Sequence, residues 1–196
     1  MYLLVKRILD IILSFLAIIC LSPILLLIAL SIKIDDPGPI FFRQKRVAIH
    51  KTYFDILKFR TMKTSTPKDC PTHLLNNPDA FITKTGKFLR KSSLDELPQI
   101  FNIFKGEMSI IGPRPALWNQ YDLLAERDKY GANDIMPGLT GWAQINGRDE
   151  LPIETKAKFD GEYVKQMSLS FDVEIFFKTI FSVLRHEGIK EGKSKE

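Results

Sequence analysis

The sequence predicts a mixed α/β, helix-rich fold, in which an apolar N-terminal helix precedes one small membrane-associated domain. Residues 8–32 form an almost entirely apolar run, which is typical of a membrane segment. Residues 40–62 show a pattern typical of a short β-hairpin, and most later segments show helical spacing of apolar side chains. What remains after the apolar run is the size of one domain. We therefore expect three parts, at 1–34, 35–189 and 190–196, the last being a disordered charged tail.

The charge and hydropathy of the chain indicate which kinds of molecule it binds. The formal net charge of +5 suits either nucleic acid or anionic lipid, but the apolar N-terminus favours lipid, so we expect no nucleic-acid partner. Cys20 lies in the apolar run and Cys70 in a polar stretch, so we expect no structural disulfide and a reducing compartment. The histidines are far apart and show no zinc-ligand spacing.

The apolar run is long enough to span a membrane, because residues 8–32 as a helix extend about 37 Å against a hydrocarbon thickness of roughly 30 Å. Pro23 has no amide proton and clashes with the carbonyl of Ile19, and Ser22 precedes it, so we expect a break into two unequal arms. Both a bent span and a re-entrant helix satisfy this pattern. Basic residues at both ends of the run are what two ends on the same side of the membrane would show.

Charged residues at the start of the run indicate how it is anchored. We expect Lys6 and Arg7 to lie at the membrane surface, with Asp10 either paired with one of them or solvated at headgroup level. A cleaved signal peptide would share the basic start, but this apolar stretch is too long and no small-x-small site follows it. We therefore expect the run to be retained as an anchor.

The segments after the run are expected to form a small mixed domain. Strand-like runs at 40–47 and 53–62 predict a hairpin. On the second strand Lys58 and Arg60 share one face, which is most commonly a solvated face. Further expected elements are a basic amphipathic helix at 81–90, helices at 95–104, 116–130 and 171–184, and a strand at 108–112. The basic helix and the Phe-rich last helix are candidates for the membrane interface, although a core-facing helix is the usual case.

The densest chemical signal is the stretch 92–99, Ser-Ser-Leu-Asp-Glu-Leu-Pro-Gln. Ser93 and Glu96 have capping-box spacing, and Pro98 is tolerated near a helix start, so a helix N-terminus is one interpretation. The same geometry places Asp95 and Glu96 at the positive end of a helix, which favours their ionised forms. An ionised Asp95 is able to attack phosphorus, and the two carboxylates are a candidate Mg2+ site beside substrate phosphates.

Four cations are candidate phosphate ligands. Arg114 follows a short predicted strand and stands between two prolines, which makes it rigid enough for bidentate phosphate binding, although an ordinary surface turn would look the same. Arg90, Arg148 and Lys58 are the further candidates. Together with a divalent ion, such cations would neutralise a diphosphate.

Taken in order, these motifs resemble the bacterial sugar transferases of the monotopic phosphoglycosyl transferase superfamily, in their minimal form. The resemblance covers essentially the whole chain, with Phe159 standing where the family commonly has Tyr. It rests on Lys6-Arg7 with Asp10, Ser22-Pro23, Pro37-Gly38-Pro39 and residues 58–62, 93–99, 106–115 and 137–148.

The resemblance implies transfer of a sugar 1-phosphate from a UDP-sugar to polyprenyl (undecaprenyl) phosphate, with release of UMP. It implies two steps through a covalent phosphosugar on Asp95, with Glu96 as the carboxylate associated with Mg2+ and Arg114 as the arginine of the Pro-Arg-Pro loop. Arg90 and Arg148 align with family arginines. The family's range of donors leads us to expect an N-acetylated amino or deoxyamino sugar.

The resemblance also implies a re-entrant helix, broken at Ser22-Pro23, with both ends on the cytoplasmic face of the bacterial inner membrane. Expected partners are the two substrates, membrane lipid and downstream glycosyltransferases, with a homodimer as one option. Two other functions are also consistent with the sequence. One is a non-catalytic membrane scaffold whose acidic pair only caps a helix, and the other is an aspartyl phosphotransferase acting on a soluble substrate.

Overall fold

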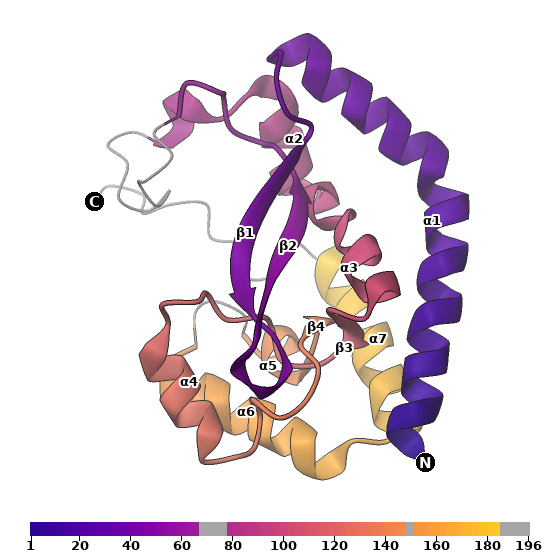
Figure 1. Ribbon diagram of the computed structural model, residues 1–196, viewed down its shortest axis with the longest axis vertical. Helices are drawn as coiled ribbons and strands as arrows, with labels where there is room; N and C mark the ends of the chain where they lie inside the picture. Colours follow the sequence, from indigo (N-terminus) through magenta and orange to yellow (C-terminus); the bar gives the residue numbers. More distant parts are fainter. Residues whose placement is uncertain (67–77, 148–150, 185–196) are drawn as a thin grey trace.

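A 34-residue helix, α1 (Tyr2–Asp35), flanks the domain along one side. The computed structural model describes residues 1–66, 78–147 and 151–184. Figure 1 shows α1 rising from the N-terminus beside α3 (Gln99–Lys105) and bending over toward α2 (Lys84–Lys91). The helix is long and apolar enough to cross a membrane, and most of its large apolar side chains are exposed. An apolar surface of this extent marks a membrane or protein contact.

Helical geometry continues through Ser22 and Pro23, so this pair does not interrupt the helix. Division of α1 into two arms by a kink at Pro23 stays a prediction. Pro23 cannot donate the backbone hydrogen bond that the Ile19 carbonyl would accept. The Ser22 hydroxyl donates to that carbonyl oxygen instead, at 2.8 Å, and so satisfies the group that the proline leaves without an amide donor. The Ser-Pro pair therefore allows a proline inside the helix without an orphaned carbonyl.

One stripe of α1 packs against the domain. Its buried residues recur at intervals that return to the same helix face, and they are Asp10, Ser14, Ile28 and Ile32. Ile28 and Ile32 share an apolar cluster with Phe59 and Leu89. Because burial of each large apolar side chain stabilises by about 1.5–3 kcal/mol, this cluster fixes the C-terminal end of α1 to the domain.

Polar contacts fix the N-terminal end of α1 to the same domain. The Lys6 ammonium and the Tyr2 hydroxyl both donate to Asp172 Oδ2 at 2.6 Å. Arg7 donates to two carbonyl oxygens in the last turn of α3, at 2.7 and 3.0 Å, where the negative end of the helix dipole favours a cation. Both ends of the apolar helix are thus attached to one body.

The expected pairing of Asp10 with Lys6 or Arg7 is wrong. Asp10 is 5% exposed and accepts a hydrogen bond from the Ile110 amide at 3.0 Å. It faces the domain because strand β3 (Ser109–Ile111) lies against α1 at this level. Anchoring of Lys6 and Arg7 to lipid headgroups stays a prediction, and both already have protein partners.

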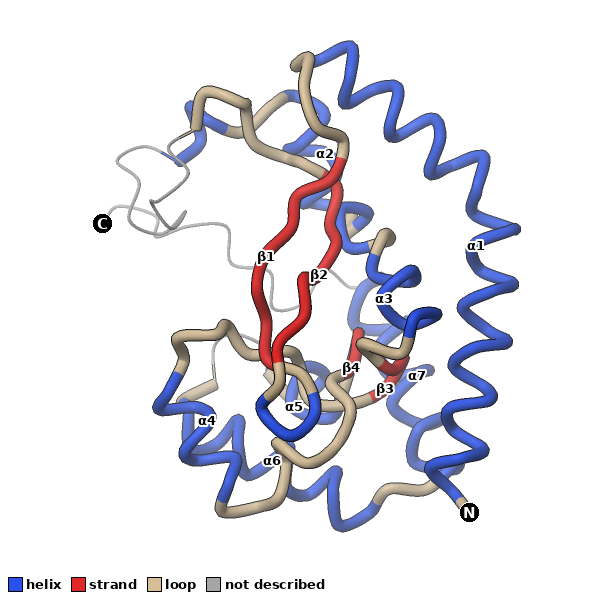
Figure 2. Tube along the Cα trace, viewed as in Figure 1, coloured by secondary structure: helices blue, strands red, loops and turns tan. Residues whose placement is uncertain are grey.

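The predicted hairpin is confirmed. Strand β1 (Phe41–Val47) pairs antiparallel with β2 (Tyr53–Phe59) across the short turn η1 (Ile49–Lys51), and Figure 2 shows the pair as a long ribbon in the middle of the molecule. Asn102 of α3 is fully buried; it accepts from the Leu57 amide and donates to the Asp55 carbonyl, both at 2.9 Å. The helix after the acidic pair is thereby held in register with the strand that carries Lys58.

Two predicted helices start later than expected. The segment 95–104 contains a single 3-10 turn, η4 (Leu94–Glu96), before α3, which begins only after Pro98. Ser93 has a φ of 56° and its side chain makes no capping hydrogen bond, so the predicted capping box is wrong. The segment 116–130 becomes α4 (Tyr121–Asp128), because residues 116 and 117 pair with β1 instead.

The C-terminal half of the domain surrounds a second, parallel pair of short strands. Strand β3 pairs with β4 (Gly138–Thr140). Helices α5 (Trp142–Ile145), α6 (Ile153–Gln166) and α7 (Leu169–Leu184) complete this half, and the turn η3 (Pro78–Phe81) precedes α2. The segments that form α2, β3 and α7 were predicted, whereas β4, α5 and α6 were not. Helix α7 buries Phe171 and Ile175 and exposes a row of apolar side chains, namely Leu169, Val173, Phe176, Phe177, Ile180 and Phe181.

We expect Asp172→Asn to lower the free energy of unfolding by about 3–5 kcal/mol. The change leaves the Lys6 ammonium, whose side chain is 11% exposed, without its counter-charge. Thermal unfolding in detergent micelles measures the effect. On the same helix, Glu174→Gln removes an ion pair to Lys178 that is half exposed, and it should cost less than about 1 kcal/mol. Equal losses for the two variants would contradict this role of Asp172.

Candidate active site

Asp95 and Glu96 lie on the turn η4, between two leucines that hold the turn in place. Leu94 and Leu97 pack on the apolar cluster formed by the end of α1, β2 and α2. Because residues three apart share one face of a 3-10 turn, the two carboxylates lie on the remaining faces. The left-handed backbone of Ser93, with φ 56°, turns the chain sharply into η4.

The Glu96 carboxylate is held by two cations from separate segments. Lys58 Nζ on β2 lies 2.7 Å from Glu96 Oε1, and Arg114 Nη2 lies 2.9 Å from the same oxygen. Burial raises the pKa of Glu96, but the Arg114 guanidinium and the Lys58 ammonium outweigh it and hold that pKa well below its usual range. Glu96 is therefore ionised at neutral pH.

Asp95 has the opposite electrostatic environment. Burial raises the pKa of its carboxyl group, the adjacent Glu96 charge adds to this, and Lys58 and Arg90 oppose it. Asp95 forms no ion pair among the residues that the structure describes. The two adjacent carboxylates thus differ in pKa and in availability, a pattern often found where carboxylates have separate chemical roles.

The other predicted cations have different positions. Arg90 on α2 donates from Nε to Thr61 Oγ1 at 2.9 Å, close enough for its charge to act on Asp95. Arg148 lies outside the described residues. The solvated strand face expected around Lys58 and Arg60 is wrong: both side chains are largely buried, and Arg60 binds the Asp36 carbonyl at the end of α1.

The donor set fits Mg2+ only together with a phosphate ligand. Across residues 1–66, 78–147 and 151–184, no group of three His, Cys, Asp or Glu residues is placed to hold a metal. Mg2+, however, commonly binds through one or two protein carboxylates plus substrate phosphates and water. Asp95 and Glu96 meet that requirement, although both cations already contact one Glu96 oxygen.

Comparison with known proteins identifies the family. Residues 1–186 match the sequence profile described as bacterial sugar transferase. The chain belongs to the bacterial sugar transferase family. It is 43% identical over 186 residues to the UDP-glucose:undecaprenyl-phosphate glucose-1-phosphate transferase of Escherichia coli (strain K12), over 91% of this chain and 40% of that protein.

Two further relatives show how far the similarity extends. An uncharacterised sugar transferase of Bacillus subtilis (strain 168) is 38% identical, over 95% of this chain and 90% of that protein. The undecaprenyl-phosphate galactose phosphotransferase of Salmonella typhimurium is 37% identical, over 93% of this chain and 41% of that protein. The chain therefore spans about two fifths of the E. coli and Salmonella proteins and nearly all of the Bacillus one. The resemblance to this family that the motifs indicated is confirmed.

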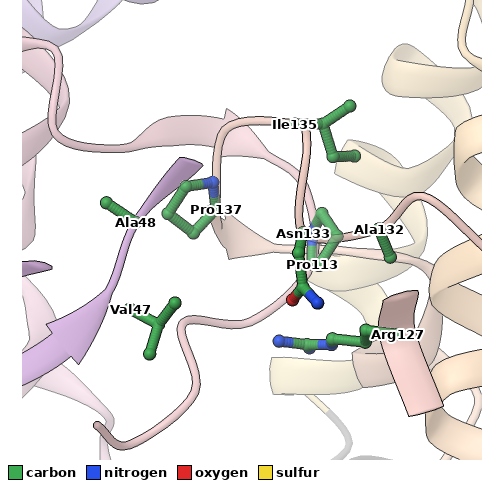
Figure 3. Close-up of a pocket in the computed structure, with 8 residues that line it drawn as sticks. All are labelled: Val47, Ala48, Pro113, Arg127, Ala132, Asn133, Ile135 and Pro137. Atoms are coloured by element: carbon green, nitrogen blue, oxygen red, sulfur yellow. The ribbon is translucent and has the colours of Figure 1, made fainter. Parts of the chain in front are cut away.

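Sequence reasoning missed one buried ion pair of this family member, between Arg127 on α4 and Asp160 on α6, at 2.7 Å. Arg127 also lines a small cavity between the hairpin end and the Pro-Arg-Pro loop, as Figure 3 shows. With a volume of about 10 Å³, it has room for about one water molecule. It is too small for a sugar nucleotide. No local pattern marks Arg127, because its partner is 33 residues away.

We expect Lys58→Met to raise the pKa of Asp95 further, because Lys58 is the cation that most opposes the effect of burial. A raised pKa keeps the carboxyl group protonated to higher pH. Carbodiimides react with protonated carboxyl groups, so mass spectrometry of labelled peptides should show Asp95 modified up to a higher pH in the variant. Lys45→Met, on the adjacent strand, removes an exposed cation and should leave the profile unchanged. Identical profiles for all three proteins would contradict the assignment.

Proposed function

We propose that the chain transfers a sugar 1-phosphate from a UDP-sugar to undecaprenyl phosphate, giving a polyprenyl-diphosphate sugar and UMP. The observation that carries this proposal is the Asp95 carboxylate, which forms no ion pair within residues 1–66, 78–147 and 151–184, beside a Glu96 that two cations hold ionised. The names of the E. coli and Salmonella relatives, both undecaprenyl-phosphate sugar-phosphate transferases, support it.

The reaction proceeds in two displacements at one phosphorus atom. A carboxylate oxygen of Asp95 attacks the phosphorus that carries the sugar, the bond to the UMP phosphate oxygen breaks, and UMP leaves with the bonding electron pair. A phosphate oxygen of undecaprenyl phosphate then attacks the same phosphorus. The Asp95 oxygen leaves as carboxylate, which regenerates the enzyme and forms the lipid diphosphate.

The surrounding cations suit this chemistry. Phosphoryl transfer needs positioning and charge neutralisation more than covalent participation of further groups. Arg114 and Lys58 contact Glu96 from separate segments, and we propose that they share their charge with phosphate oxygens, assisted by Arg90 and Arg148. Mg2+, held by Asp95, Glu96 and the substrate phosphates, would supply further charge neutralisation when bound.

The attachment of α1 supports a re-entrant topology at the cytoplasmic face of the inner membrane. The helix is about 50 Å long, and both its ends contact the same domain, through Lys6 and Arg7 at one end and Ile28 and Ile32 at the other. A straight span would take the first end across the bilayer and strip Asp10 of its buried partner. A re-entrant helix instead keeps both ends beside cytosolic UDP-sugar while its apolar middle lies in lipid.

The identity of the sugar is a separate question. The named relatives act on glucose and galactose donors, whereas the range of the wider superfamily suggests an N-acetylated amino or deoxyamino sugar. A UMP-release assay across a panel of UDP-sugars, with undecaprenyl phosphate and Mg2+, distinguishes these donors. Downstream glycosyltransferases would then extend the lipid-linked product.

We expect Asp95→Asn to abolish UMP release and the covalent phosphosugar, because an amide is a poor nucleophile toward phosphorus. The wild-type protein, incubated with radiolabelled UDP-sugar but no lipid acceptor, should retain label after denaturation, and the variant should not. Asp122→Asn changes an exposed carboxylate on α4 and should leave both readouts intact. Normal transfer by folded Asp95→Asn would refute the nucleophile, and absence of UMP release by the wild type from every donor would favour the scaffold alternative.

We expect a cysteine at position 3 to be reachable only from the cytoplasm. Leu3 is 60% exposed, so Leu3→Cys in a background without Cys20 and Cys70 gives one labelling site. A membrane-impermeant maleimide should label it in permeabilised spheroplasts but not in intact ones. Asn119→Cys, exposed on the domain, is the matched control for the cytoplasmic side. Labelling of Leu3→Cys alone in intact spheroplasts would show that α1 spans the membrane.

A further inference from the structure

Three consecutive carbonyl oxygens of the loop 113–115 are each held by a donor from a different element. The Gly138 amide on β4 donates to the first at 2.8 Å. Arg127 Nη2 on α4 donates to the second at 3.0 Å, and Arg46 Nη1 on β1 donates to the third at 3.0 Å. The two prolines of the loop have no amide protons, so these carbonyl groups are its principal backbone attachments.

The middle donor, Arg127, is itself fixed by a buried counter-ion. Asp160 on α6 is 1% exposed and Arg127 is 4% exposed. Asp160 Oδ2 lies 2.7 Å from both Nε and Nη2 of Arg127, so two contacts set the plane of the guanidinium. Figure 3 shows Arg127 on the wall of the small cavity that Pro113 also lines. The same Nη2 atom therefore serves the carboxylate and the carbonyl of the loop.

We propose that Arg127 and Asp160 are positioning residues that set the Arg114 guanidinium against Glu96. The carbonyl that Arg127 holds belongs to Arg114 itself, and Arg114 Nη2 reaches Glu96 Oε1 at 2.9 Å. A shift of that carbonyl displaces the base of the Arg114 side chain directly. This inference rests on the proposed function, because it gives Arg114 a role in the transfer reaction.

Stability alone is a weak reason for this ion pair. Apolar side chains of similar volume often stabilise a core as well as a buried ion pair does, since both charges must be desolvated. What apolar side chains cannot supply is the hydrogen bond to the Arg114 carbonyl. The planar guanidinium is suited to serve two acceptors in fixed directions, whereas a lysine ammonium on a flexible stem is not.

A double-mutant cycle with Arg114→Met tests the proposal. We expect Arg127→Lys to lower kcat/KM for UMP release by about 10-fold to 100-fold, as a small misplacement of a reacting group does. In the Arg114→Met background the same change should cost less than about threefold, because no guanidinium remains to be positioned. A merely structural role would lower kcat/KM by the same factor in both backgrounds, and that result would overturn the proposal.

A matched control variant and a substitute variant separate loss of positioning from loss of folding. Asp128→Asn changes the neighbouring residue on α4, which pairs with Lys51 at the surface, and should leave kcat/KM unchanged in both backgrounds. If Arg127→Lys does not fold, the paired change Arg127→Met with Asp160→Leu replaces it in the same cycle. Absence of transfer by the wild type refutes the proposed function and this inference with it. Normal wild-type transfer with equal factors refutes only the positioning role.

Discussion

The contact on which the site depends is the double attachment of Glu96 Oε1 to Lys58 and Arg114. A largely buried carboxylate such as Glu96 is costly without compensating cations. The hairpin, the turn η4 and the Pro-Arg-Pro loop must therefore meet at one oxygen atom. Other buried polar groups serve this meeting: Asn102 holds α3 in register with β2, and Arg127 holds the carbonyl of Arg114.

The same turn also packs against the long apolar helix α1. Leu94 and Leu97, on either side of the acidic pair, pack on the cluster that contains Ile28 and Ile32 of α1. A displacement of the C-terminal half of α1 would thus move the turn that carries Asp95. In the proposed reaction this turn would present Asp95 first to the soluble nucleotide and then to the lipid-linked phosphate, so each displacement would occur at a reacting group that is already positioned. The apolar exposed face of α7 gives the domain a further surface suited to the lipid interface.

Local patterns predicted the hairpin and the segments of α2, β3 and α7. Lys58, Glu96 and Arg114 were separate candidates in the sequence, and the folded chain brings them together. The local patterns succeeded because alternation, turn residues and adjacent carboxylates are visible over a few positions. They failed at Ser93, where tertiary packing imposes a left-handed backbone that removes the capping box. Strand β4 pairs with a strand far away in the sequence, and the Arg127–Asp160 pair joins two helices. Neither has a local signature, so only the folded chain reveals them.

The opposite electrostatic environments of Asp95 and Glu96 suit two adjacent carboxylates to different roles, with Asp95 as the proposed nucleophile and Glu96 as the partner of the cations. Glu96 is ionised, and its carboxylate is paired with Lys58 and Arg114. The two hydrogen bonds that it accepts from them lower its nucleophilicity. Asp95 forms no ion pair in the described part of the chain, and burial raises its pKa. A carboxylate with a raised pKa is the stronger nucleophile once ionised. Lys58 lies close enough to favour that ionised form without binding it, so a single lysine both neutralises Glu96 and keeps Asp95 available for attack.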